Sequence, residues 1–102
     1  MNDLVRIAGV RPLDGHWLRL WFTDGAVKDV DLREALAGGG VFEEIHRDRD
    51  VFERVRVNPE SRTIEWPGGV DLDPDVLYGK FEAADGVRIE RRVVDEAAMN
   101  PR

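Results

Sequence analysis

The chain has 102 residues and a mass of 11.6 kDa, which predicts one compact domain and leaves no room for a second. It contains no cysteine, so disulfides, thiolate nucleophiles and cysteine-ligated zinc are excluded. The formal net charge of −6 argues against a mainly electrostatic grip on nucleic acid or an anionic membrane, because phosphate binding needs clustered Lys and Arg. This charge favours a basic protein as the partner.

The amino terminus lacks the basic and apolar regions of a secretory signal. No window approaches the roughly 18 apolar residues that a membrane-spanning helix needs. We therefore expect a cytoplasmic protein that makes no membrane contact.

Three strands are predicted in the first third of the chain. Residues 4–13 form the first, with a bulge or bend at Gly9. Residues 16–23 alternate cleanly, which places Leu18, Leu20 and Phe22 on one face and Trp17, Arg19 and Trp21 on the other. The dipeptide Asp24-Gly25 is typical of a tight hairpin turn with positive φ, and residues 26–30 return as the third strand.

Short helices are expected in the middle of the chain. Asp31 is predicted to cap the first, with Glu34 as its capping-box partner and Gly38 at its end. Residues 41–45 predict a one-turn anchor, and Asp48 is placed to cap a second helix.

A second hairpin and a last helix follow. Residues 55–57 and 62–66 predict its two strands, with a turn between them, and residues 67–69 end the hairpin. Asp73, followed by Pro74 at the first helical position, begins a helix through residues 77 and 78. We expect the side chains of this helix end to meet Trp66 across the glycine turn as core partners.

The sequence thus predicts one small α+β domain. It would hold an antiparallel sheet of about five strands, namely two hairpins plus the first strand, with two or three short helices against one face. Residues 1–81 are expected to form this domain. Residues 82–102 are expected to be a carboxyl-terminal extension that is either an edge strand or partly disordered.

The densest motif runs from residue 63 to residue 78, and further elements precede it in a fixed order. The pattern is Val10-Arg11-Pro12-Leu13, Leu18-x-Leu20-x-Phe22-Thr23-Asp24-Gly25, Val30-Asp31-Leu32, Phe42, Phe52, Val55-x-Val57 and Thr63-Ile64-Glu65-Trp66-Pro67-x-Gly69-Val70-Asp71-Leu72-x-Pro74-x-x-Leu77-Tyr78. Over about residues 4 to 80 it resembles a bacterial family known as domain of unknown function 2442. The structural motif residues are Asp24, Gly25, Trp66, Gly69, Asp71, Asp73, Pro74, Leu77 and Tyr78.

The resemblance implies a small α+β domain. Such domains stand alone or precede a helix-turn-helix, and they are often encoded beside another small protein, which has led to their being proposed as antitoxins. No helix-turn-helix fits after Tyr78, and residues 82–102 extend past the usual end of the family. The resemblance implies no catalytic residues.

Two groups of residues are candidates for metal binding. Asp71, Asp73, Asp75 and Glu82 stand at positions 1, 3, 5 and 12 of a calcium loop, but Val76 replaces the glycine that the loop needs at position 6. A helix start fits these aspartates better. His16 and His46 have no ligand partner at helical spacing and are expected on the surface or in loops. We expect no metal and no cofactor.

No catalytic constellation is visible, so an enzyme is not expected, although an active site or small-ligand site assembled only in space stays open. The arginines between residues 47 and 62 alternate with carboxylates, which is typical of a mixed-charge solvated face rather than a direct nucleic-acid surface.

The best candidate for partner binding is the strand face with Trp17, Arg19 and Trp21, because Trp and Arg are enriched at interface hot spots. The alternative is that the two tryptophans pack under a helix or under residues 82–94. We therefore expect a protein-interaction module, the acidic antitoxin-like or regulatory partner of a basic protein encoded nearby. A homodimer is a further option, and a small-ligand-binding protein or undetected enzyme is the alternative function.

Overall fold

The computed structural model describes residues 4–79 and 87–94. The elements in chain order are β1 (Ile7–Pro12), β2 (Trp17–Phe22), β3 (Val27–Asp31), α1 (Arg33–Leu36), η1 (Gly40–Phe42), α2 (Glu43–Arg47), α3 (Arg49–Phe52), β4 (Arg56–Val57), β5 (Ile64–Trp66), β6 (Val70–Asp71), α4 (Pro74–Tyr78) and β7 (Glu90–Val93). Within these residues, no helix has the length and apolar character that crossing a membrane requires.

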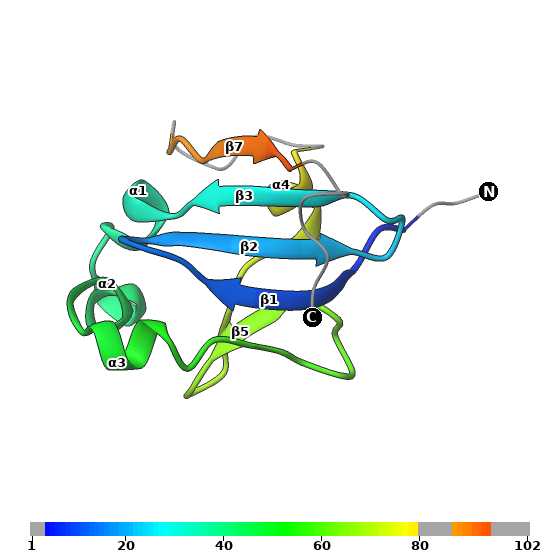
Figure 1. The fold of residues 1–102 in the computed structure, drawn as a ribbon. Helices are drawn as coiled ribbons and strands as arrows, with labels where there is room; N and C mark the ends of the chain where they lie inside the picture. The colour runs from blue at the N-terminus through cyan, green and yellow to red at the C-terminus, as the bar shows by residue number, and fades with distance from the viewer. Residues whose placement is uncertain (1–3, 80–86, 95–102) are drawn as a thin grey trace.

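The larger sheet has the strand order β1-β2-β3-β7, and every neighbouring pair is antiparallel (Figure 1). Leu18 lies opposite Val30 and Leu20 lies opposite Val10, so the apolar residues of three strands share one face. We call this the inner face and the opposite one the outer face. The register shifts between Ile7 and Gly9, which confirms the predicted bulge.

The turn between β2 and β3 differs in detail from the prediction. Gly25 has a φ of +93°, whereas Asp24 is not among the described residues with positive φ. The Asp24 side chain instead accepts a hydrogen bond from the Ala26 N–H at 2.9 Å. One glycine in the left-handed region is therefore enough, and the aspartate stabilises the turn through its carboxylate.

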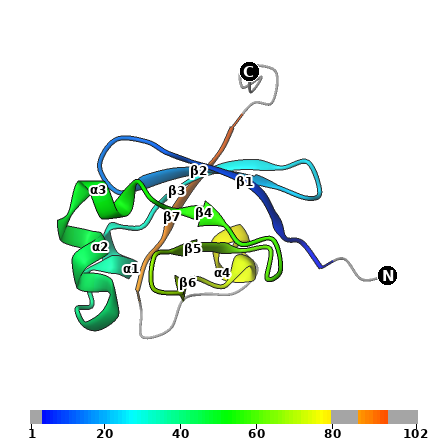
Figure 2. The same ribbon diagram turned by 90° about the horizontal axis from the view of Figure 1, so that it is seen from below.

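The second hairpin lies in a separate sheet. Strands β4, β5 and β6 form a three-stranded antiparallel sheet, and β6 pairs with β5 after the turn at residues 67–69. Figure 2 shows this sheet and α4 together on the inner side of the larger sheet. The predicted α+β class is confirmed, with the strands divided between two sheets. Each hairpin has one apolar face, and stacking the two buries both.

The helices are each about one turn long, and two begin as predicted. Asp48 accepts from the Asp50 N–H at 3.0 Å, and Asp73 accepts from the Asp75 N–H at 2.8 Å. The predicted capping box at α1 is wrong. Asp31 does accept from the Arg33 N–H, but the N-cap position is residue 32, and the Glu34 carboxylate instead accepts from the distant Arg88 N–H.

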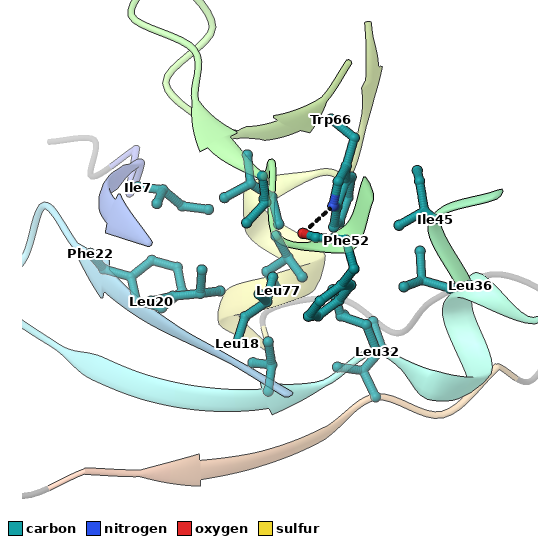
Figure 3. Close-up of a cluster of buried hydrophobic side chains, with 14 of the residues drawn as sticks. Ile7, Leu18, Leu20, Phe22, Leu32, Leu36, Ile45, Phe52, Trp66 and Leu77 are labelled. Carbon is teal, nitrogen blue, oxygen red and sulfur yellow. Dashed lines mark hydrogen bonds between the residues drawn. The ribbon is translucent and has the colours of Figure 1, made fainter. Parts of the chain in front are cut away.

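The core lies between the two sheets and is closed at one end by the short helices. Figure 3 shows Trp66 next to Phe52 in this core, and the indole Nε1–H donates to the Phe52 carbonyl at 3.0 Å. That bond satisfies the polar edge of the largest buried side chain, which is only 1% exposed. The fully buried residues around it include Ile7, Leu18, Leu20, Val30, Leu32, Leu36, Phe52, Ile64 and Leu77.

Candidate functional site

The outer face of the larger sheet carries the residues predicted to bind a partner. Trp17, Arg19 and Trp21 project there from β2, and all three are half-buried. In Figures 1 and 2 the described helices and the smaller sheet lie on the other side or at the end of the sheet. No described helix or strand covers this face.

Arg19 forms a bidentate ion pair with Asp29, the residue directly opposite it on β3. Nε donates to Oδ1 at 2.8 Å, and a terminal nitrogen donates to Oδ2 at 2.9 Å. This hydrogen-bonded carboxylate raises the pKa of Arg19. Because Asp29 is one of two buried polar residues in the described core, the pair gives the centre of the outer face a fixed geometry.

The two tryptophans have separate contacts. The Arg92 guanidinium of β7 lies 4.1 Å from the centroid of the Trp17 ring, a cation–π distance. Trp21 packs against Gly9 of β1, where an added Cβ would lie 3.4 Å from the indole. A residue from the segment 82–94 thus contacts Trp17, while both tryptophans remain partly exposed on the outer face.

Two motif residues from distant parts of the chain, Asp24 and Tyr78, meet beside the core. The Tyr78 hydroxyl donates to the Asp24 carboxylate at 2.6 Å across 54 residues of sequence. This hydrogen bond lowers the pKa of Asp24 and raises the pKa of Tyr78. The Tyr78 ring also packs edge-on against Phe22.

Lys28 and Arg91 hold the carboxyl end of α4. Lys28 Nζ donates to the Tyr78 carbonyl at 2.7 Å, and Arg91 donates to the carbonyls of Leu77 and Val76 at 3.1 and 2.7 Å. Burial lowers the pKa of Lys28, and the nearby Arg91 charge adds to this effect. These cations hydrogen-bond the last carbonyls of α4, of which that of Val76 also accepts from the Gly79 N–H at 3.2 Å. The motif residues Asp24, Leu77 and Tyr78 therefore take part in the contacts that hold α4 in place.

The remaining motif residues lie around the β5–β6 turn. Gly69 has a φ of +83° and donates its N–H to the Trp66 carbonyl at 3.1 Å. Asp71 pairs with Glu65 in the smaller sheet. Pro74 occupies the first helical position after the Asp73 cap, as predicted.

Asp71, Asp73 and Asp75 line one hollow at the surface, together with Arg6. Among the described residues, no group of three or more side chains is placed to bind a metal ion. The Asp73 carboxylate serves as a helix cap, and Glu82 lies outside the described residues.

The structure brings together two histidines that lie thirty residues apart in the sequence. The rings of His16 and His46 are stacked, with centroids 4.6 Å apart and planes inclined by 5°. His16 Nε2 lies 2.8 Å from the His46 carbonyl oxygen, and the Phe52 ring meets His16 edge-on. No spacing in the sequence signals this pair, because it depends on how the β1–β2 loop meets α2.

A groove of about 580 Å³ runs past the histidine pair. Its lining combines a loop, two helices and an apolar floor, namely Asp14, Gly15, His16, Ile45, His46, Arg47, Arg49, Phe52 and Glu53. Parallel stacking excludes one metal ion bound by both imidazoles in this arrangement, because each nitrogen lone pair lies in the plane of its own ring.

Arg49 joins α3 to the loop beside this groove. Its guanidinium donates to the carbonyls of Leu13 and Gly15, and its Nε pairs with Glu53 at 2.7 Å. Arg56 pairs with Glu65 in the same way. Part of the arginine-rich stretch therefore forms ion pairs within the chain.

Comparison with known proteins assigns the family. No curated protein and no solved structure matches the chain. Residues 7–83 match a family described as a protein of unknown function (DUF2442). This range includes the turn between β2 and β3, all three strands of the smaller sheet and α4. The chain therefore belongs to the DUF2442 family.

Proposed function

We propose that this chain is a protein-interaction module rather than an enzyme, and that the outer face of its larger sheet binds a basic protein. The proposal rests on one observation: Trp17 and Trp21 flank the ion-paired Arg19 on a sheet face that no described helix or strand covers. Rigid aromatic and arginine side chains are the residues that most often dominate binding energy.

The contacts within this face support a binding role. Arg19 and Asp29 are already locked together, so little side-chain entropy is lost when a partner covers them. The Arg92 guanidinium on Trp17 adds a flat, partly apolar platform. Such a preorganised face can bind without a change in the backbone.

The charge of the chain selects the kind of partner. Two copies would each carry a net charge of −6 and would repel one another, whereas a basic protein would be attracted. A basic partner encoded nearby agrees with the antitoxin-like or regulatory role that members of the family have been proposed to play. We propose that role for this chain, in the cytoplasm.

Titration calorimetry with the product of the neighbouring gene tests the proposal. Trp17→Gln and Trp21→Gln should each weaken binding tenfold or more, since hot-spot residues cost at least about 2 kcal/mol when truncated. The exposed Arg54, which follows α3 in the chain and is not part of the larger sheet, supplies Arg54→Gln as the matched control that should bind normally.

Thermal melting must show that the variants remain folded. Unchanged affinity in both tryptophan variants would remove the outer face from the proposal. Sedimentation of the pure chain adds a second test, because a stable homodimer that buries Trp17 and Trp21 would replace the basic partner with a second copy.

The groove at the histidine pair supports a second candidate, a small-ligand-binding protein. Its volume of about 580 Å³ falls in the range of small-molecule sites, and it combines an apolar floor with imidazole and guanidinium groups. Native mass spectrometry of the purified protein would show a bound small molecule as added mass, which His46→Ala should remove.

A further inference from the structure

The outer face of the larger sheet carries a row of charged side chains, one from each strand. Arg19 of β2 lies between Arg11 of β1 and Asp29 of β3, and Asp29 lies opposite Arg92 of β7. Residues directly opposite one another on neighbouring strands have side chains on the same face. We call these four residues the arginine row. Its three guanidiniums and one carboxylate give a formal charge of +2, in a chain whose net charge is −6.

The single carboxylate of the row is fully used by one guanidinium. Arg19 donates to both Asp29 oxygens, at 2.8 and 2.9 Å. Arg92 lies opposite Asp29 across the strands, but its guanidinium is placed 4.1 Å from the centroid of the Trp17 ring. In the part of the chain that the structure describes, Arg92 forms no ion pair. Its charge is therefore held over an aromatic ring, with hydrogen-bond donors left for another carboxylate.

Arg11 is the second guanidinium without a carboxylate. It is exposed, it lies opposite the positively charged Arg19, and it has no ion pair among the described residues. Like charges directly opposite on neighbouring strands destabilise a sheet. A carboxylate bound at Arg11 would offset this repulsion, so the isolated chain carries an unfavourable contact that a suitable partner relieves.

The neighbours of the arginine row along the strands differ on its two sides. On one side it borders Trp21 and Val27, which are uncharged and lie opposite each other. On the other side it borders Trp17, Asp31 and Glu90. These two carboxylates line a small hollow together with two further arginines and a third carboxylate. The excess positive charge of the outer face is therefore concentrated in the arginine row, beside two partly exposed tryptophans.

We propose that the arginine row binds carboxylates of the partner protein, with an acidic segment of that protein lying across the strands over Arg11 and Arg92. Three strand spacings separate these two residues, about 14 Å, which matches carboxylates four residues apart in an extended chain. This inference rests on the proposed function, because it takes the outer face as a protein-binding surface. The net charge of the chain attracts a basic partner as a whole, whereas the row selects the groups that the partner presents at the contact.

A protein carboxylate fits the row better than the backbone of a nucleic acid. A phosphate backbone is a polyanion, which a chain with a net charge of −6 repels at long range. The row offers two guanidiniums without an ion pair among the described residues, enough for a few carboxylates but not for a long run of phosphates.

Nuclear magnetic resonance titration with hexaglutamate is the test, followed through the indole N–H signals. The signals of Trp17 and Trp21 should shift, whereas that of Trp66 should stay in place, because its indole is buried and bound to a carbonyl. Arg11→Gln and Arg92→Gln should each weaken peptide binding about threefold, in the range of an exposed ion pair. Arg54→Gln is the matched control, an exposed arginine outside the larger sheet, and should bind the peptide as the wild type does.

Three outcomes would overturn the inference: unmoved signals of Trp17 and Trp21, equal weakening in Arg54→Gln, or a shift of the same signals by hexathymidylate at lower concentration than by hexaglutamate. The last would replace the protein carboxylates with a nucleic acid. The peptide titration needs no partner, so its result is separate from the calorimetry. Indole shifts without binding of the neighbouring gene product would keep the carboxylate site and remove the proposed partner. Binding of that product without indole shifts would do the reverse.

Discussion

The two faces of β2 are held by different forces, although their residues alternate along the same six-residue strand. On the inner face Leu18 and Leu20 are fully buried, and their contribution depends on apolar area that has no preferred direction. On the outer face, Arg19 and its neighbours are held by an ion pair and ring contacts that require particular partners. The inner face therefore supplies most of the apolar burial that stabilises the fold, whereas the geometry of the outer face depends on specific ion-pair and ring contacts.

The largest expected effect tests the inner face. Leu20→Ala should lower the free energy of unfolding by about 3 kcal/mol, because it removes buried methyl groups and leaves a cavity between the sheets. Urea denaturation followed by tryptophan fluorescence measures this loss. A loss below about 1 kcal/mol would mean that neighbouring side chains fill the cavity left at residue 20. The two faces of β2 would then contribute more nearly equally to stability than their burial indicates.

A smaller loss is expected when the ion pair of the outer face is broken. Asp29→Ala should cost about 2 kcal/mol, because it leaves the partly buried Arg19 guanidinium without its carboxylate. The control is Arg56→Gln at the more exposed pair with Glu65, which should cost less than about 1 kcal/mol. Equal losses in the two variants, again in urea, would remove the distinction between this pair and an ordinary surface ion pair.

A pH effect is predicted at the rim of the inner face. The hydrogen bond from Tyr78 holds the pKa of Asp24 below its unfolded value of about 3.9. Its stabilising contribution is therefore complete above that value and is lost as the pH falls through the folded-state pKa. Tyr78→Phe should raise the pKa of Asp24, as measured by carboxyl carbon chemical shifts. An unchanged pKa would show that the turn backbone, not the tyrosine, is responsible.

The smallest effect concerns the space beneath Trp21. Gly9 is outside the left-handed region, and a methyl group there would make ordinary contact with the indole at 3.4 Å. Gly9→Ala should therefore stabilise the fold by about 0.5 kcal/mol, chiefly by restricting the unfolded chain. Destabilisation measured by the same urea titration would show that the Trp21 ring is packed too tightly against β1 to make room for the added methyl group.

Local features of the fold could be read from the sequence. The alternation in β2, the Asp48 cap and the Asp73-Pro74 helix start each depend on residues within one turn or one strand, and the structure confirms them. The capping box failed because Glu34 finds a distant backbone partner in Arg88, and local propensity cannot anticipate such competition.

Contacts between segments far apart in the chain could not be predicted from the sequence. The alternation in the two hairpins predicts their apolar faces but not whether they lie side by side in one sheet or stack as two. The His16–His46 stack and the Tyr78–Asp24 bond join residues 30 and 54 positions apart, and a single sequence carries no record of such proximity. The outer face was different, because the alternation of Trp17, Arg19 and Trp21 places them together whatever the rest of the fold does.

The strand β7 lies beyond residue 83, where the match to the family ends, yet it pairs with β3 along its length. The adjacent Ile89 is part of the core, and Arg91 holds two carbonyls of α4. A chain shortened to the family boundary would leave β3 as an open sheet edge and the end of α4 without two of its donors. The sheet and core of this chain thus extend past the segment that matches the family, and expression of the shorter segment should yield a protein prone to aggregation.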